Sequence, residues 1–143
     1  MRVRRQALGA WEVLRALRAM VVIEFSLRTN DLPATCRRLR VRCDLDRLTH
    51  PHPPAAELAV LPRRTRPAVL ASLAVVSRWP AGDTCLRRCL LIGHRLRRLE
   101  PVLRIGVRRD ANGEFSAHSW LEFGGNTLDP MAFEFAPLGS VGR

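Results

Sequence analysis

The sequence contains no lysine and no tyrosine, so all 24 of its basic residues are arginines. Against 13 acidic residues, they give a formal net charge of +11. Such a charge attracts nucleic acids, anionic membranes or acidic peptides. The usual companions of nucleic-acid binding are missing, because no aromatic-interleaved basic strand, zinc-finger spacing or helix-turn-helix pattern is recognisable. The charge therefore favours an acidic peptide or an acidic partner protein, and we expect no nucleic acid.

Metal-binding and disulfide frameworks are also poorly supported. Four cysteines in 143 residues do not make a disulfide scaffold. Cys36 and Cys43 are seven residues apart, which is wider than a zinc-knuckle spacing, and the sequence has no CxxC or HxxxH pair. We therefore expect neither a zinc site nor a cofactor.

No targeting or membrane-spanning segment is evident. The first 20 residues lack the uninterrupted apolar core and the small-residue cleavage site of a signal peptide. The apolar run over residues 16–27 is interrupted by Arg18 and Glu24, and it is too short to cross a bilayer. The expected location is the cytoplasm, where reducing conditions keep thiols reduced.

The length of 143 residues predicts a single compact domain with two regions. Residues 1–65 form an N-terminal helical region: a long helix over 7–28, a short basic helix over 34–41, and a Pro-rich linker at 50–54. Residues 66–143 form the core, which begins with a helix over 66–76. The first helix is apolar over more than half of its circumference. We expect it to pack on the core, with a partner-docking or membrane-facing surface as the alternative.

A helix beginning near residue 84 places a cysteine in its first turn. Thr84 is a suitable N-cap, and apolar residues then recur at helical spacing as far as Leu99. The N–H groups and the positive end of the helix dipole favour the thiolate form of Cys85. Cys85 alone fits a reactive thiol and a packing role about equally, whereas Cys89 is better explained as a small buried hydrophobe.

Three strands are predicted after this helix. Residues 102–108 form the first, residues 114–123 return after a turn, and residues 126–133 follow a two-residue turn at Gly124 and Gly125. This turn length makes Asp129 a diagonal neighbour of His118 on one face of the sheet. A three-residue loop would instead place Asp129 on the other face.

A catalytic interpretation of His118 and Asp129 depends on their combination with Cys85. Alone, His118 fits a half-buried strand histidine, and Asp129 fits a strand-ending turn. A thiol nucleophile, however, needs a base, and the base needs a group that orients it. The candidate catalytic residues are therefore Cys85, His118 and Asp129.

The segments CLRRCLLIGHRL, RIGVRRDANGEFSAHSWLEFGG and TLD carry a family resemblance. Over residues 66–130 the chain resembles the lasso peptide B2 proteins, transglutaminase-like cysteine proteases that remove the leader peptide from a ribosomally made lasso peptide precursor. Cys85, His118 and Asp129 fall on the family's nucleophile, base and orienting acid. The sequence departs from the family at Cys89, where serine or alanine is more usual.

The resemblance implies an α+β fold with a papain/transglutaminase-like core. In it, the nucleophile helix packs on a small antiparallel sheet, preceded by N-terminal helices. The implied partners are the precursor's leader, a separate leader-recognition protein of the B1 type and an asparagine-synthetase-like cyclase. Two alternatives are a non-catalytic transglutaminase-like module that binds peptides and a small basic nucleic-acid-binding protein.

Overall fold

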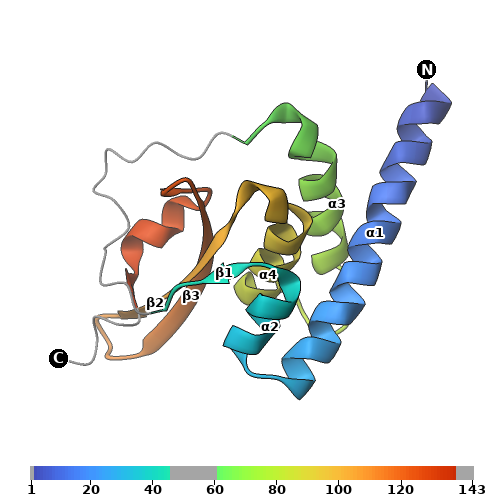
Figure 1. Cartoon of the computed structure of the whole chain (residues 1–143). Coiled ribbons are helices and arrows are strands. Elements are labelled where there is room, and N and C mark those ends of the chain that lie inside the picture. Colours follow the sequence, from blue (N-terminus) through green and yellow to red (C-terminus); the bar gives the residue numbers. More distant parts are fainter. Residues whose placement is uncertain (1, 46–60, 138–143) are drawn as a thin grey trace.

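Four helices surround one side of a small mixed sheet in the computed structural model, which describes residues 2–45 and 61–137 (Figure 1). The predicted α+β fold is confirmed, whereas the Pro-rich linker lies outside the described residues. The helices are α1 (Arg2–Thr29), α2 (Leu32–Leu39), α3 (Arg66–Val76) and α4 (Cys85–Arg95). The strands are β1 (Arg42–Cys43), β2 (Val102–Arg109), β3 (Phe115–Phe123), β4 (Asn126–Thr127) and β5 (Ala136–Pro137). Short 3-10 helices are η1 (Arg63–Thr65), η2 (Arg97–Leu99) and η3 (Pro130–Glu134).

The long helix α1 packs along α3 and α4 through one stripe (Figure 1). Ala16, Met20 and Ile23 of this stripe are completely buried. Much of the remaining apolar surface is exposed, including Trp11, Leu14, Leu17, Val21 and Phe25. Core packing is thus confirmed for one face. None of the helices in the described ranges has the length and apolar content that a bilayer crossing requires.

The C-terminus of α2 turns the chain into a strand that the sequence did not predict. Arg40 adopts a left-handed conformation with φ 57°, and the N–H of Val41 donates to the carbonyl of Cys36 at 3.0 Å. This is a Schellman ending, which satisfies the last carbonyls of the helix and ends it. β1 then pairs in parallel with β2, with Arg42 opposite Val102. The sheet is consequently antiparallel except for β1.

The hairpin that carries the candidate histidine has the predicted two-residue turn. Gly124 and Gly125 have φ values of 59° and 86°, as a primed turn requires, and Phe123 lies opposite Asn126. The predicted third strand over 126–133 is wrong beyond Thr127, because β4 ends there and η3 begins at Pro130. Proline has no N–H with which to continue the ladder.

The two faces of β3 are covered by different elements. Leu121 and Phe123 belong to the main core, which also holds Leu90 and Leu91 of α4. Trp120 faces the other way and packs in a small cluster with Ala132 and Phe135, at and just after η3. The site residues on the Trp120 face are therefore enclosed by the segment that follows the hairpin.

Candidate active site

Cys85 is the first residue of α4, as predicted. Thr84 has an extended conformation, and its Oγ1 accepts a hydrogen bond from the N–H of Arg87 at 3.3 Å. This N-cap fixes the helix start. The Cys85 side chain is half-buried, and the N–H of Cys85 has no acceptor among the described residues. An unused N–H beside a thiol can stabilise negative charge on an oxygen bound there.

An ion pair from α1 fixes the start of α4 in place. The guanidinium of Arg87 donates to both carboxylate oxygens of Glu24, at 2.9 and 3.3 Å, and the indole N–H of Trp79 donates to the same carboxylate at 3.3 Å. The hydrogen bond from Arg87 is the main cause that holds the pKa of Glu24 below its ordinary value, against the opposing effect of burial. These three residues join α1, α4 and the loop before Cys85. Sequence reasoning missed them, because their separations of 55 and 63 residues leave no local signal.

His118 and Asp129 are in direct contact. His118 Nε2 lies 2.6 Å from Asp129 Oδ2. An ionised carboxylate can only accept a hydrogen bond, so Nε2 carries the proton in this pair. In the neutral ring, this leaves Nδ1 as the acceptor. The predicted reach between the two side chains is therefore realised.

Asp129 is held on both sides of its carboxylate. Its Oδ1 accepts from the N–H of Met131 at 2.9 Å and so caps η3, while its own N–H donates to Thr127 Oγ1 at 3.1 Å. The other oxygen, Oδ2, is the one that meets His118. The same turn that ends the third strand early thus orients the carboxylate toward the histidine.

The His118 ring lies against two aromatic rings. Its centroid is 5.0 Å from that of Phe135 and 6.4 Å from that of Trp120. The Arg108 guanidinium also lies over the Phe135 ring, 5.0 Å from its centroid. These contacts limit the positions open to the imidazole, whose side chain is only 17% exposed. Sequence reasoning missed Phe135, because the predicted third strand did not return the chain to this face.

Cys89 joins α4 to the backbone of β3 beside His118. Its thiol donates to the carbonyl of Ser119 at 3.3 Å. If the register of β4 continued, Pro130 would lie opposite Ser119, so no strand N–H competes for this carbonyl. Burial is the main cause that raises the pKa of the Cys89 thiol to about 12, and nearby Cys85 and Asp129 add to the rise. Cys89 is therefore a neutral packing residue, as predicted.

The position of Cys85 relative to His118 follows from this contact. Cys85 precedes Cys89 by one helical turn, and Cys89 touches the residue that follows His118. In the described part of the chain no hydrogen bond joins the Cys85 thiol to His118. Catalytic hydrogen bonds are often long in ligand-free enzymes and shorten when substrate binds. Within residues 2–45 and 61–137, no three histidine, cysteine or acidic side chains gather as metal ligands.

The comparisons with known proteins identify the family of this site. No curated protein and no solved structure matches the chain. A family model described as the transglutaminase-like superfamily matches residues 19–138, which include the start of α4, the hairpin and η3. Because this match covers most of the sequence, the chain belongs to the transglutaminase-like superfamily.

Proposed function

We propose that this chain is a cysteine peptidase that removes the leader from a ribosomally made lasso peptide precursor. The observation that carries the proposal is the 2.6 Å contact between His118 and Asp129, together with a cysteine at the start of a helix that contacts β3 one residue after His118. Transglutaminase-like domains often have a cysteine protease fold, which agrees with these residue types. Cys85 is the nucleophile, His118 the base and Asp129 the orienting acid.

The proposed reaction begins with proton transfer from the Cys85 thiol to His118 Nδ1. Sγ attacks the scissile carbonyl, and the N–H of Cys85 stabilises the oxyanion. His118 then protonates the leaving amine as the C–N bond breaks, which leaves a thioester on Cys85. His118 next takes a proton from water, whose oxygen attacks the thioester and releases the carboxylate product. Asp129 keeps the imidazole in the required tautomer throughout.

The lasso peptide assignment rests on the motif resemblance around Cys85 and His118. It implies a separate leader-recognition protein, and an asparagine-synthetase-like cyclase that consumes the product. The exposed apolar side chains of α1 offer that recognition protein a contact surface, and they include Trp11, Val21 and Phe25. The thiols of Cys36, Cys85 and Cys89 suit a reducing compartment.

A non-catalytic peptide-binding module is the second candidate, and the absence of a Cys85–His118 hydrogen bond in the described residues favours it. Such a module would bind a peptide beside the same residues without chemistry. A peptide carrying a thiol-reactive group separates the two. An enzyme forms a rapid adduct on Cys85 that depends on His118, whereas a binding module forms none.

The function is tested with the cognate precursor, with and without the leader-recognition protein, by mass spectrometry of the products. We expect one specific cut between leader and core, with the recognition protein accelerating it on dilute substrate. Equal rates in both mixtures would contradict the partner requirement. No cut in either mixture, combined with salt-dependent DNA binding near physiological salt, would instead support the nucleic-acid alternative.

A further inference from the structure

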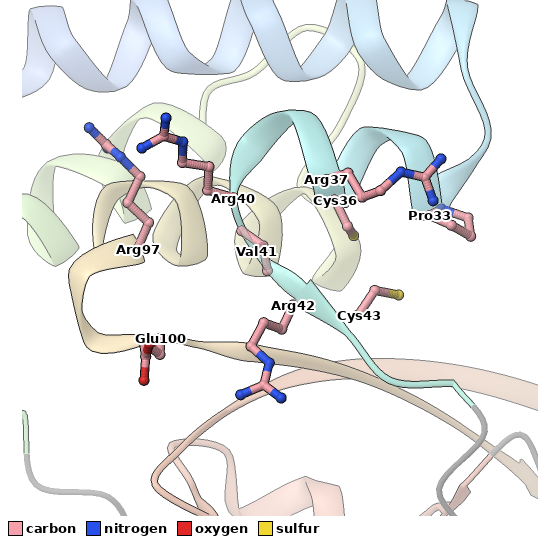
Figure 2. Close-up of a pocket in the computed structure, with 9 residues that line it drawn as sticks. All are labelled: Pro33, Cys36, Arg37, Arg40, Val41, Arg42, Cys43, Arg97 and Glu100. Atoms are coloured by element: carbon pink, nitrogen blue, oxygen red, sulfur yellow. The ribbon is translucent and has the colours of Figure 1, made fainter.

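A cavity of about 460 Å³ lies between α2, β1 and the segment that follows the C-terminal end of α4 (Figure 2). Four arginines line it: Arg37 of α2, Arg40 after that helix, Arg42 of β1 and Arg97 of η2. We call this feature the arginine cavity. Glu100 is its only acidic lining residue among those described. Two chain segments, one near residue 40 and one near residue 97, thus bring positive charge to one cavity.

These arginines differ from the arginines on α4 in their ion pairing. Arg87, Arg88 and Arg95 each pair with a carboxylate. In contrast, Arg37, Arg40 and Arg42 are exposed and have no carboxylate partner among the described residues. Arg97 donates only to a carbonyl of the preceding turn, that of His94, at 3.0 Å. The positive charge around the arginine cavity is therefore available to a ligand.

Local structure alone does not explain all of these charges. A cation in the last turn of α2 stabilises the helix dipole, which accounts for Arg37. Arg42 lies on a strand, where no dipole favours it. Arg40 has φ 57°, a left-handed conformation that is unfavourable for a residue with a Cβ. Glycine would satisfy that backbone better, so the fold does not require a guanidinium there.

The floor of the arginine cavity is apolar. The exposed Pro33 gives this lining accessible apolar surface, and Val41 and Cys36 are almost completely buried beneath the arginines. Burial is the main cause that raises the pKa of the Cys36 thiol to about 12, so the thiol is uncharged at neutral pH. An apolar floor with a basic rim suits a peptide in which acidic and apolar side chains are mixed. A nucleic-acid backbone offers phosphates but no such side chains.

The directions of the arginine side chains indicate an extended ligand. In Figure 2, Arg40 and Arg97 extend to one side, Arg37 to the other, and Arg42 away from both. A single small anion would need them to converge. A second cavity of about 610 Å³ shares Arg97 and adds Arg64 and Arg98, together with Arg15 and Arg95, which both pair with Glu12. The basic surface therefore continues past the arginine cavity.

We propose that the arginine cavity binds an acidic segment of the peptide substrate and so acts as a docking site distant from the cut. The substrate's identity rests on the proposed function, whereas the docking chemistry does not. The 11 residues of α4 span roughly 16 Å at 1.5 Å per residue. An extended peptide covers that distance in about five residues. The docked carboxylates therefore lie about five to ten residues from the scissile bond.

Docking is measured by fluorescence anisotropy with a fluorescein-labelled peptide of alternating glutamate and leucine, on the full chain carrying Cys85→Ala. We expect Arg37→Gln/Arg40→Gln/Arg42→Gln to weaken binding at least tenfold. The matched control, Arg18→Gln/Arg63→Gln/Arg78→Gln, removes the same charge from exposed positions outside the arginine cavity. We expect it to weaken binding less than threefold. Equal losses would overturn the proposal, because net charge alone would then explain binding.

Two further arms sharpen this test. A peptide with glutamine in place of glutamate should bind at least tenfold more weakly. A labelled oligonucleotide of equal charge tests whether the surface binds polyanions in general. If it binds as tightly as the peptide and loses affinity in the same triple variant, the peptide proposal is overturned. Thermal unfolding should show both triple variants folded, since the replaced side chains are exposed.

Kinetics separate this inference from the proposed function. On a substrate with glutamates five to ten residues from the cut, the cavity variant should raise KM at least fivefold and leave kcat unchanged. If cleavage occurs and neither KM nor probe binding responds to the variant, the docking site is wrong while the peptidase stands. If the probe binds the arginine cavity but no precursor is ever cut, the docking site stands while the peptidase is wrong.

Discussion

The arginines at the start of α4 differ from those around the arginine cavity past its end, although Arg95, the last residue of the helix, also pairs with a carboxylate. At the start, the guanidinium of Arg87 forms a bidentate ion pair with the carboxylate of Glu24. The guanidinium of Arg88 lies 2.7 Å from the carboxylate of Asp83. Past the end, Arg97 joins three arginines that have no carboxylate partner in the described residues. Paired arginines hold a backbone in place, whereas unpaired ones remain open to a ligand. One helix thus supports a rigid site at one end and an available charged surface at the other.

This difference separates two kinds of effect. Substitutions near Cys85 should lower the rate of the chemical step, because reacting groups tolerate little displacement. Substitutions at the arginine cavity should weaken substrate binding and leave the rate of the chemical step unchanged. The following predictions test the rigid end, from the largest expected effect to the smallest.

After loss of the nucleophile itself, the largest effect is expected from Asp129→Asn. The new amide can still accept from the N–H of Met131 and cap η3, but its NH₂ faces His118 Nε2 and favours the wrong tautomer. We expect single-turnover cleavage to fall about 10²- to 10⁴-fold with little change in melting temperature. A folded variant with full activity would mean that Asp129 does not orient the base.

An insertion in the hairpin tests the same pair through backbone register. One alanine between Gly125 and Asn126 should cost about as much activity as Asp129→Ala, because a one-residue shift reverses the facing of the following side chains. Two alanines should restore part of the activity. Circular dichroism confirms folding. Full activity in a folded single insertion would move the search for the orienting group to Asn126.

Substituting either Glu24 or Arg87 by glutamine should moderately lower the stability of the fold around the start of α4. We expect each to lower the free energy of unfolding by about 1–3 kcal/mol, since loss of Glu24 leaves the Arg87 charge unpaired and loss of Arg87 leaves Glu24 with only Arg28 and Trp79 as partners. The double variant should cost less than the sum of the single ones. Denaturant unfolding of all four proteins measures this coupling. Additive losses would show that the pair does not act as a unit.

The Glu24 effect should also depend on pH. Its pKa is lowered in the folded state, so its contribution is present above the unfolded pKa of about 4.5 and is lost as pH falls through the folded value. The stability difference between the wild type and Glu24→Gln should therefore shrink below about pH 4. A constant difference from pH 7 to pH 3 would contradict this linkage.

The smallest effect is expected from Cys89→Ser. A serine hydroxyl can donate to the carbonyl of Ser119 as the thiol does, and the resembled family carries serine there. We expect less than a threefold change in cleavage rate and about 1 kcal/mol or less in stability. A large loss of activity without unfolding would reassign the nucleophile to Cys89.

Short sequence motifs predicted the structural features that depend only on neighbouring residues. The helix start at Thr84 and the turn at Gly124 and Gly125 follow from capping and from positive φ. Pro130 also carried a local signal, the missing N–H that ends β4, but the predicted strand continued through it. The chain's motifs identified the superfamily for the same reason, since they lie in these short segments.

Long-range pairings could not be predicted in this way. β1 and β5 have only two residues each, and partners far along the chain define them. The contact of Glu24 with Arg87 spans 63 residues, and no periodicity reports it. The arginine cavity likewise combines segments near residues 40 and 97. Only the folded chain shows which arginines are paired and which are available.

The most direct test of the central claim is single-turnover cleavage of the cognate precursor by Cys85→Ala, with melting temperature as the folding control. Cys85 is half-buried and lies outside the main core, so the variant should fold normally. The account predicts a loss of at least about 10³-fold, because the nucleophile forms the bond that begins the reaction. A well-folded Cys85→Ala that cuts the precursor near the wild-type rate would contradict it.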